Sequence, residues 1–138
     1  MKKMEEQIDI DQLIAAAAAA REKAYTPYSD FKVGAALLLA DGAVTEGCNI
    51  ENASYGATVC AERVAILKAR SENPEAQIRA IAVVTQSESP SPPCALCLQV
   101  MAEFCAPETP IILANTGGKR LTYRFDELLP HPFTKSLL

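Results

Sequence analysis

The sequence predicts an α/β fold built around one mixed β-sheet. Three helical segments alternate with short apolar segments rich in β-branched residues, which is typical of a sheet covered by helices on both faces. A hairpin in the first half of the chain adds an antiparallel pair and makes the sheet mixed. The chain has 138 residues, which predicts a single domain over 1–138, because most domains contain about 100–200 residues.

The first half of the chain contains a helix followed by the hairpin. Residues 9–24 include a run of alanines and predict a helix, because alanine has the highest helix propensity; Asp9 or Asp11 is the expected N-cap. Residues 31–40 are apolar and predict a strand. An Ala-Asp-Gly turn leads into residues 43–48, whose alternating pattern indicates the returning strand.

The second half alternates helices with strands. Helices are predicted over 60–72 and 94–105, and the second of them begins directly after two prolines. Buried strands are predicted over 78–86 and 110–115, and an edge strand over 119–125 follows a Thr-Gly-Gly turn. Since crossover connections are right-handed and join parallel strands, we expect the last strand pairs to be parallel.

Composition excludes several classes of protein. Thirteen Lys and Arg against seventeen Asp and Glu give a net charge of −4, which disfavours nucleic-acid binding, because that binding depends on neutralising phosphates. No apolar run approaches the roughly 18 residues of a membrane span. The acids in MKKMEEQIDIDQ argue against a signal peptide. We therefore expect a cytoplasmic protein with reduced thiols.

Five cysteines then become informative. In a reducing compartment clustered cysteines indicate metal binding or catalysis, whereas Cys48 and Cys105 have no patterned neighbours and are expected to be small buried hydrophobic residues. Cys60 begins one predicted helix, and Cys94 and Cys97 lie in the first turn of another. Helix N-termini favour thiolates. Three converging thiolates predict a Zn²⁺ site with a fourth position open to water, as in catalytic zinc sites.

Two charged residues follow Cys60. Glu62 cannot easily bind the same ion as Cys60, and we expect it beside the metal as a proton carrier; the alternative is a solvated acid in the first turn of the helix. Arg63 can offset the negative charge of the thiolates by hydrogen-bonding the sulfurs, or it is a surface arginine. His131 is the single histidine and is expected on the surface.

These motifs resemble a known family. Cys60-Ala61-Glu62 together with Pro93-Cys94-x-x-Cys97 matches the all-cysteine form of the zinc deaminase motif. The segments YTPYSDFKVGAALL, GCNIENASYG, CAERVAI and ELLPHPF make the chain similar to the short, homotetrameric cytidine deaminases from Tyr25 to Phe133. The resemblance implies a three-layer α/β/α sandwich with a five-stranded mixed sheet. It also implies one Zn²⁺ per subunit and hydrolytic deamination of cytidine and deoxycytidine in pyrimidine salvage.

The resemblance also implies a role for individual residues. Cys60, Cys94 and Cys97 match the zinc ligands, and Glu62 matches the proton shuttle. The remaining matches concern the substrate: Asn49 and Glu51 for the ribose hydroxyls, Phe31 beside the nucleoside, Ala61 for a backbone contact to the base, and Ala53, Tyr55 and Phe133 for a neighbouring subunit's pocket.

The chain departs from the family pattern around the last two cysteines. Ala95 and Leu96 replace a smaller pair, and Leu98 replaces an arginine. Leu98 either faces the thiolates, leaving a cation missing there, or packs against the sheet. Two other functions stay open: deamination of another cytosine-bearing nucleoside or a nucleoside antibiotic, and a structural zinc or redox C-x-x-C module.

Overall fold

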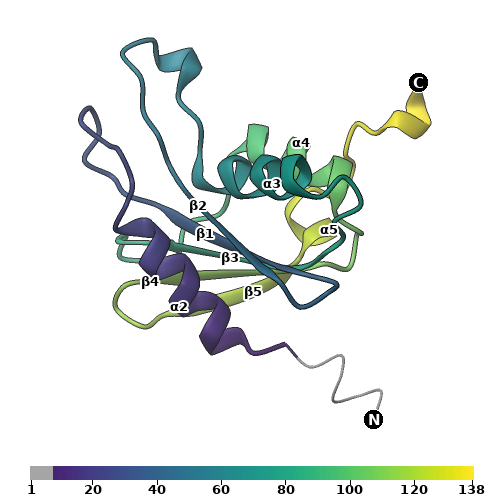
Figure 1. The fold of residues 1–138 in the computed structure, drawn as a ribbon, viewed down its shortest axis with the longest axis horizontal. Coiled ribbons are helices and arrows are strands. Elements are labelled where there is room, and N and C mark those ends of the chain that lie inside the picture. Colours follow the sequence, from purple (N-terminus) through teal and green to yellow (C-terminus); the bar gives the residue numbers. More distant parts are fainter. Residues whose placement is uncertain (1–7) are drawn as a thin grey trace.

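Five strands form one mixed sheet in the computed structural model, which describes residues 8–138 (Figure 1). The sheet has the order β2-β1-β3-β4-β5. Its strands are β1 (Gly34–Leu39), β2 (Val44–Cys48), β3 (Ile78–Thr85), β4 (Pro110–Asn115) and β5 (Arg120–Arg124). The segment used above to argue against a signal peptide begins outside the described residues. Among those residues, no helix has the length and apolar character needed to cross a membrane.

Helices cover both faces of the sheet. Helix α2 (Ile10–Arg21) crosses one face, and α3 (Ala61–Glu72) and α4 (Ala95–Phe104) lie on the other face, with the short α5 (Phe125–Leu128) (Figure 1). Two 3-10 turns, η1 (Tyr55–Ala57) and η2 (Lys135–Leu137), complete the elements. The three-layer α/β/α sandwich is therefore confirmed, and so is the predicted order of helices and strands.

One expectation about strand direction is wrong. Strands β1 and β2 form the predicted antiparallel hairpin, and β3 and β4 are parallel because α4 crosses between them. Strand β5, however, runs antiparallel to β4. The connection over 116–119 is a tight turn with Gly118 at φ +97°, and so short a connection can join only antiparallel strands. Strand β5 is at the edge of the sheet, as predicted.

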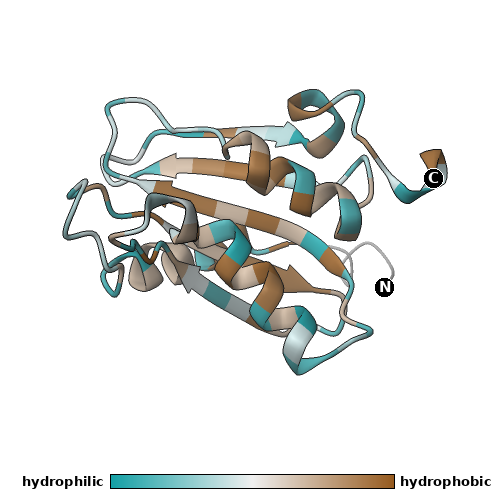
Figure 2. Cartoon of the chain, turned by 90° about the horizontal axis from the view of Figure 1, so that it is seen from above, coloured by the Kyte–Doolittle hydropathy of each residue, from teal (hydrophilic) through white to brown (hydrophobic). Residues whose placement is uncertain are grey.

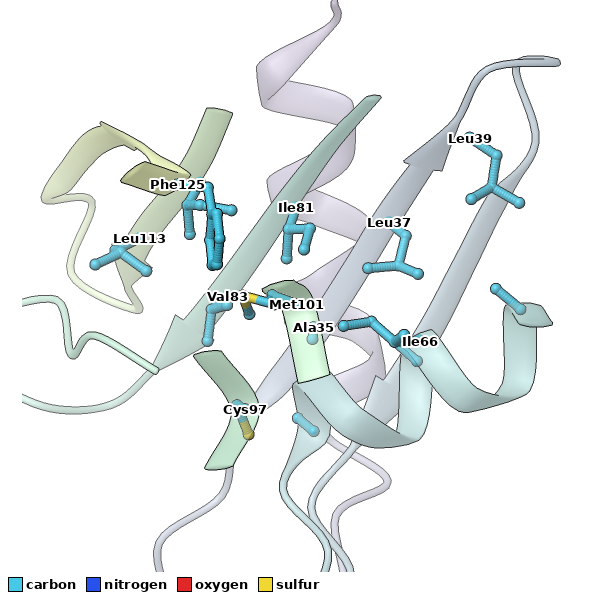
Figure 3. Close-up of a cluster of buried hydrophobic side chains, with 14 of the residues drawn as sticks. Ala35, Leu37, Leu39, Ile66, Ile81, Val83, Cys97, Met101, Leu113 and Phe125 are labelled. Atoms are coloured by element: carbon cyan, nitrogen blue, oxygen red, sulfur yellow. The ribbon is translucent and has the colours of Figure 1, made fainter. Parts of the chain in front are cut away.

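The core is divided by the sheet. Between the sheet and α3/α4 the largest buried side chains include Leu37, Ile66, Ile81 and Met101 (Figure 3). Hydrophobic residues follow the central strands, while the turns at their ends are mostly hydrophilic (Figure 2). The face under α2 is lined mainly by alanines and other small side chains, so this helix lies very close to the sheet. A Cβ on Gly34 would come within 1.9 Å of the Ala17 carbonyl oxygen.

Three helices begin at polar or thiol-bearing N-caps. The Asp9 carboxylate accepts a hydrogen bond from the Gln12 amide at 3.0 Å, so that Asp9 rather than Asp11 caps α2. Cys60 and Cys94 are the N-caps of α3 and α4, and both have extended backbones. The two helix N-termini thereby bring their cysteines together at one edge of the α/β core.

Candidate active site

Three thiols converge where α3 and α4 begin. The Sγ atom of Cys94 lies 3.8 Å from that of Cys60 and 3.6 Å from that of Cys97, and the three sulfurs lie within 4.8 Å of one another. Two thiolates bound to one tetrahedral zinc at about 2.3 Å are separated by roughly 3.8 Å. The spacing of these sulfurs therefore fits a zinc ion held by three cysteines.

Charge and hydrogen bonding favour one thiolate in this cluster, that of Cys60. The pKa of Cys60 is lowered to about 5, first by the neighbouring Cys97 thiol and then by hydrogen bonds with Arg63 and Cys94, which together outweigh burial. The same interaction with Cys60, together with burial, raises the pKa of Cys97. Arg63 places Nη2 3.6 Å from the Cys60 sulfur, as predicted. Its buried Nε has no hydrogen-bond partner among the described residues, so one donor of this guanidinium is unused.

Glu62 is buried beside this cluster. Only 4% of its surface is exposed, so the alternative of a solvated first-turn acid is wrong. Burial raises the pKa of its carboxyl to about 7, and the Cys60 charge adds to this effect, while its own backbone N–H opposes it. A carboxyl in such surroundings can be either protonated or ionised near neutral pH, which is what a proton carrier requires.

A cavity of about 260 Å³ joins the cysteines to polar residues from the opposite side. Its lining includes Cys60, Ala61, Glu62 and Cys94. The other predicted substrate-binding residues that line it are Phe31, Asn49 and Glu51. Six more lining residues were not predicted as site residues from the sequence: Ser29, Val33, Val83, Thr85, Ser91 and Pro92. The only sequence signal for these was their position next to a strand end or to the cysteine motif.

Asn49 and Glu51 also hold the segment that precedes β1. Asn49 accepts a hydrogen bond from the Val33 amide and donates one to the Phe31 carbonyl, both at 2.8 Å. The Glu51 carboxylate accepts hydrogen bonds from the Tyr28 and Ser29 amides and from the Ser29 hydroxyl. The Ser29 hydroxyl is the largest cause of the lowered pKa of Glu51. Each of the two side chains therefore keeps only part of its hydrogen-bonding capacity for a ligand.

Three of the predicted substrate-binding residues do not line this cavity in their own chain. Tyr55 is 78% exposed and lines an adjacent cavity of about 340 Å³, which it shares with Tyr28 and Glu51. Ala53 is exposed, and Phe133 is 58% exposed. The Gln99 side chain donates a hydrogen bond to the Phe133 carbonyl at 2.8 Å, which fastens the C-terminal segment to α4.

The remaining sequence expectations concern residues outside the site. His131 is exposed, as predicted. Cys48 and Cys105 are half-buried and lie outside the sulfur cluster. Burial raises the pKa of Cys105 to about 12, so this thiol stays protonated and packs as an apolar group against the core.

The packing of Leu98 decides between the two positions that the sequence left open for it. It is partly buried and packs against the core cluster between the sheet and α3/α4. Ala95 and Leu96, the other two departures in the motif, are exposed, and Leu96 retains 64% of its surface. Arg63 is therefore the cation that this chain places against the cysteine sulfurs.

We expect Leu98→Arg to destabilise the fold, because a guanidinium would replace a side chain packed against apolar neighbours. The free energy of unfolding should fall by roughly 1–3 kcal/mol, measured by urea denaturation of the zinc-loaded protein. Leu96→Arg, on the exposed face of the same helix, is the matched control and should change stability by less than about 0.5 kcal/mol. Equal stabilities of the two variants would contradict the packing of Leu98.

Three cysteines at two helix N-termini, two of which line a cavity together with a buried glutamate, define the zinc-dependent deaminase class. Residues 7–113 match the family model of the cytidine and deoxycytidylate deaminase zinc-binding region. The chain belongs to this family.

Its relatives cover nearly the whole chain. It is 53% identical over 127 residues to a cytidine deaminase of Halalkalibacterium halodurans, covering 92% of this chain and 96% of that protein. It is 48% identical to a cytidine deaminase of Sporosarcina psychrophila, covering 93% of each chain. The crystal structure of cytidine deaminase from Burkholderia pseudomallei superposes with a TM-score of 0.85 at 47% identity, covering 91% of this chain and all of that one.

Proposed function

We propose that this protein catalyses the zinc-dependent hydrolytic deamination of cytidine and deoxycytidine, giving uridine and deoxyuridine with release of ammonia. The observation that carries the proposal is the buried carboxyl of Glu62, which lines the same cavity as Cys60 and Cys94, two of the three cysteines spaced for zinc. The identity to cytidine deaminases over more than nine-tenths of the chain supports the substrate class. A structural zinc site would not need this cavity or this carboxyl.

Cys60, Cys94 and Cys97 would hold the zinc ion, and Arg63 would offset part of their negative charge. When bound, zinc supplies a Lewis acid that makes water nucleophilic at neutral pH. Glu62 would give a proton to N3 of the base as C4 becomes tetrahedral, and would then protonate the departing amine. Its burial keeps bulk water from competing for that proton.

The rest of the cavity would orient the nucleoside. Ala61 is the first residue of α3, and its backbone N–H has no partner within the helix, so it is free to donate to the carbonyl of the base. Phe31 would pack beside the nucleoside, and the unused hydrogen-bonding capacity of Asn49 and Glu51 would bind the ribose hydroxyls.

A substrate panel tests this proposal directly. Zinc-loaded protein is assayed by ultraviolet absorbance with cytidine, deoxycytidine, cytosine, adenosine and an aminoacyl-nucleoside analogue. The proposal expects turnover of the first two. Turnover restricted to the analogue would instead support the alternative of a nucleoside-antibiotic deaminase.

We further propose a homotetramer whose active sites are shared between subunits, in a cytoplasmic protein of pyrimidine salvage. Ala53, Tyr55 and Phe133 would then complete a neighbouring subunit's cavity. Their exposure, and the placement of Ala53 and Phe133 away from the cavity of their own chain, support this assignment.

We expect Phe133→Ala to raise the KM for cytidine while zinc content and kcat stay near those of the parent. The aromatic ring would be lost from the wall of a neighbour's pocket, and the cysteines would be unaffected. A roughly tenfold rise corresponds to about 1.4 kcal/mol of lost contact. Steady-state kinetics and elemental analysis provide the two readouts.

Leu138→Ala is the control, because Leu138 is exposed in the same C-terminal segment and is assigned no role. Mixing Phe133→Ala with Glu62→Gln subunits should restore some sites with the parent KM in hybrid oligomers, because each such site combines an intact Glu62 with a neighbour's intact Phe133. If no activity with the parent KM appears after subunit exchange has been demonstrated, the sites are self-contained and the shared-site proposal is wrong.

A further inference from the structure

Three hydroxyls form a network at the end of β3. The Ser87 Oγ atom lies 2.7 Å from Thr85 Oγ1 and 2.8 Å from Ser91 Oγ, and it donates a hydrogen bond to the Ser89 carbonyl. The loop is held in place at its base. Asn115 donates hydrogen bonds to the Ser87 and Glu88 carbonyls at 3.1 and 2.9 Å.

The arrangement determines where the protons lie. A carbonyl oxygen can only accept, so the single hydroxyl proton of Ser87 is committed to Ser89. The two remaining contacts of Ser87 Oγ therefore require Thr85 and Ser91 to be the donors, and Ser87 Oγ accepts both bonds with its two lone pairs. With their protons directed at Ser87, the Thr85 and Ser91 oxygens are left with acceptor capacity only.

Both of these oxygens belong to residues that line the candidate active site, whereas Ser87 does not line it. Thr85 is 2% exposed and shares one face of β3 with Val83, which also lines the cavity. Ser91 lies three residues before Cys94, on the segment that leads into the sulfur cluster. Among the cavity residues with no role assigned above, Thr85 and Ser91 are the two with side-chain hydroxyls, apart from Ser29, which is bonded to Glu51.

We propose that Thr85 and Ser91 form an acceptor pair that recognises the N–H groups of the exocyclic amine of cytosine. The inference rests on the proposed function and deepens it. In a base joined to ribose through N1, the exocyclic amine carries the only N–H donors of cytosine. Uracil has a carbonyl oxygen at the same carbon. This oxygen and the acceptor pair would all carry partial negative charge and would repel one another. The pair would thus favour substrate over product through hydrogen-bond polarity.

The test compares the KM for cytidine with the inhibition constant of uridine, measured on zinc-loaded protein. Thr85→Val keeps the shape of the side chain and removes the acceptor. We expect it to raise the KM for cytidine by roughly three- to tenfold, the range produced by losing one hydrogen bond. The inhibition constant of uridine should stay unchanged or fall. Thr109→Val, at another buried threonine outside the cavity, controls for general effects of the substitution.

Ser87→Ala provides the sharper measurement, because Ser87 itself does not line the cavity. Without their common acceptor, the Thr85 and Ser91 hydroxyls can turn their protons into the cavity and donate to the uracil carbonyl. Uridine should then inhibit several-fold more strongly, with a smaller change in the KM for cytidine. A purely structural effect would weaken both ligands together.

Parallel changes for cytidine and uridine in both variants would overturn the inference while leaving the proposed function intact. Such a result would place the two hydroxyls against the ribose, which the nucleosides have in common, or outside the bound ligand altogether. If the unmodified zinc-loaded protein neither converts cytidine nor binds uridine, the proposed function itself is wrong and the inference falls with it.

Discussion

Glu62→Gln should reduce kcat for cytidine by about a hundred- to ten-thousand-fold, the contribution typical of a general acid–base group. Glutamine has nearly the same shape as glutamate and can fill the buried site in the first turn of α3. It cannot carry a proton to the ring nitrogen or to the departing amine. Because Glu62 is not assigned to the metal, zinc content and the thermal unfolding midpoint should match those of the parent protein.

Glu72→Gln is the matched control for this substitution. Glu72 is the last residue of the same helix and is exposed, so the variant should retain full activity. If Glu62→Gln deaminates cytidine within a few-fold of the parent rate, the proton-carrying role is wrong. If it loses zinc as well as activity, Glu62 acts through the metal centre instead.

The cysteine cluster could be predicted because its determinants are local. Cys60 and Cys94 each occupy the N-cap of a helix whose start is marked in the sequence, and the C-x-x-C spacing places Cys97 one helical turn further on. The placement of Glu62 beside the cysteines could be predicted for the same reason, since its position follows directly from that of Cys60.

Features that depend on contacts between distant segments could not be predicted in this way. Strand β5 was expected to be parallel to β4, although the turn chemistry of Gly118 carried the signal for reversal. The role of Ser29 depends on Glu51, which is 22 residues away along the chain. The side toward which Leu98 points depends on how α4 is rotated against the sheet, and the motif alone does not define that rotation.

The metal centre offers the last test and the largest expected effect. Cys97 is fully buried, in the first turn of α4, and packs in the same cluster as Val83 and Met101 (Figure 3). Cys97→Ser preserves the size of this side chain, but a serine hydroxyl does not ionise at neutral pH and is a poor ligand for zinc. We expect elemental analysis to show about one zinc per chain in the parent and almost none in the variant.

Activity of Cys97→Ser should fall by more than the roughly 10⁴-fold upper limit expected for Glu62→Gln. Glu62→Gln removes one proton carrier, whereas loss of zinc removes the group that makes water nucleophilic, because bound zinc lowers the pKa of water to about 7. The unfolding midpoint provides a readout that is independent of catalysis. A ligand that binds only the folded state stabilises it, so added zinc should raise the midpoint of metal-free parent protein and leave that of Cys97→Ser unchanged.

Cys105→Ser, at a half-buried cysteine outside the cluster, should keep both zinc and activity. A zinc-replete, active Cys97→Ser protein would show that the metal does not require this third thiolate.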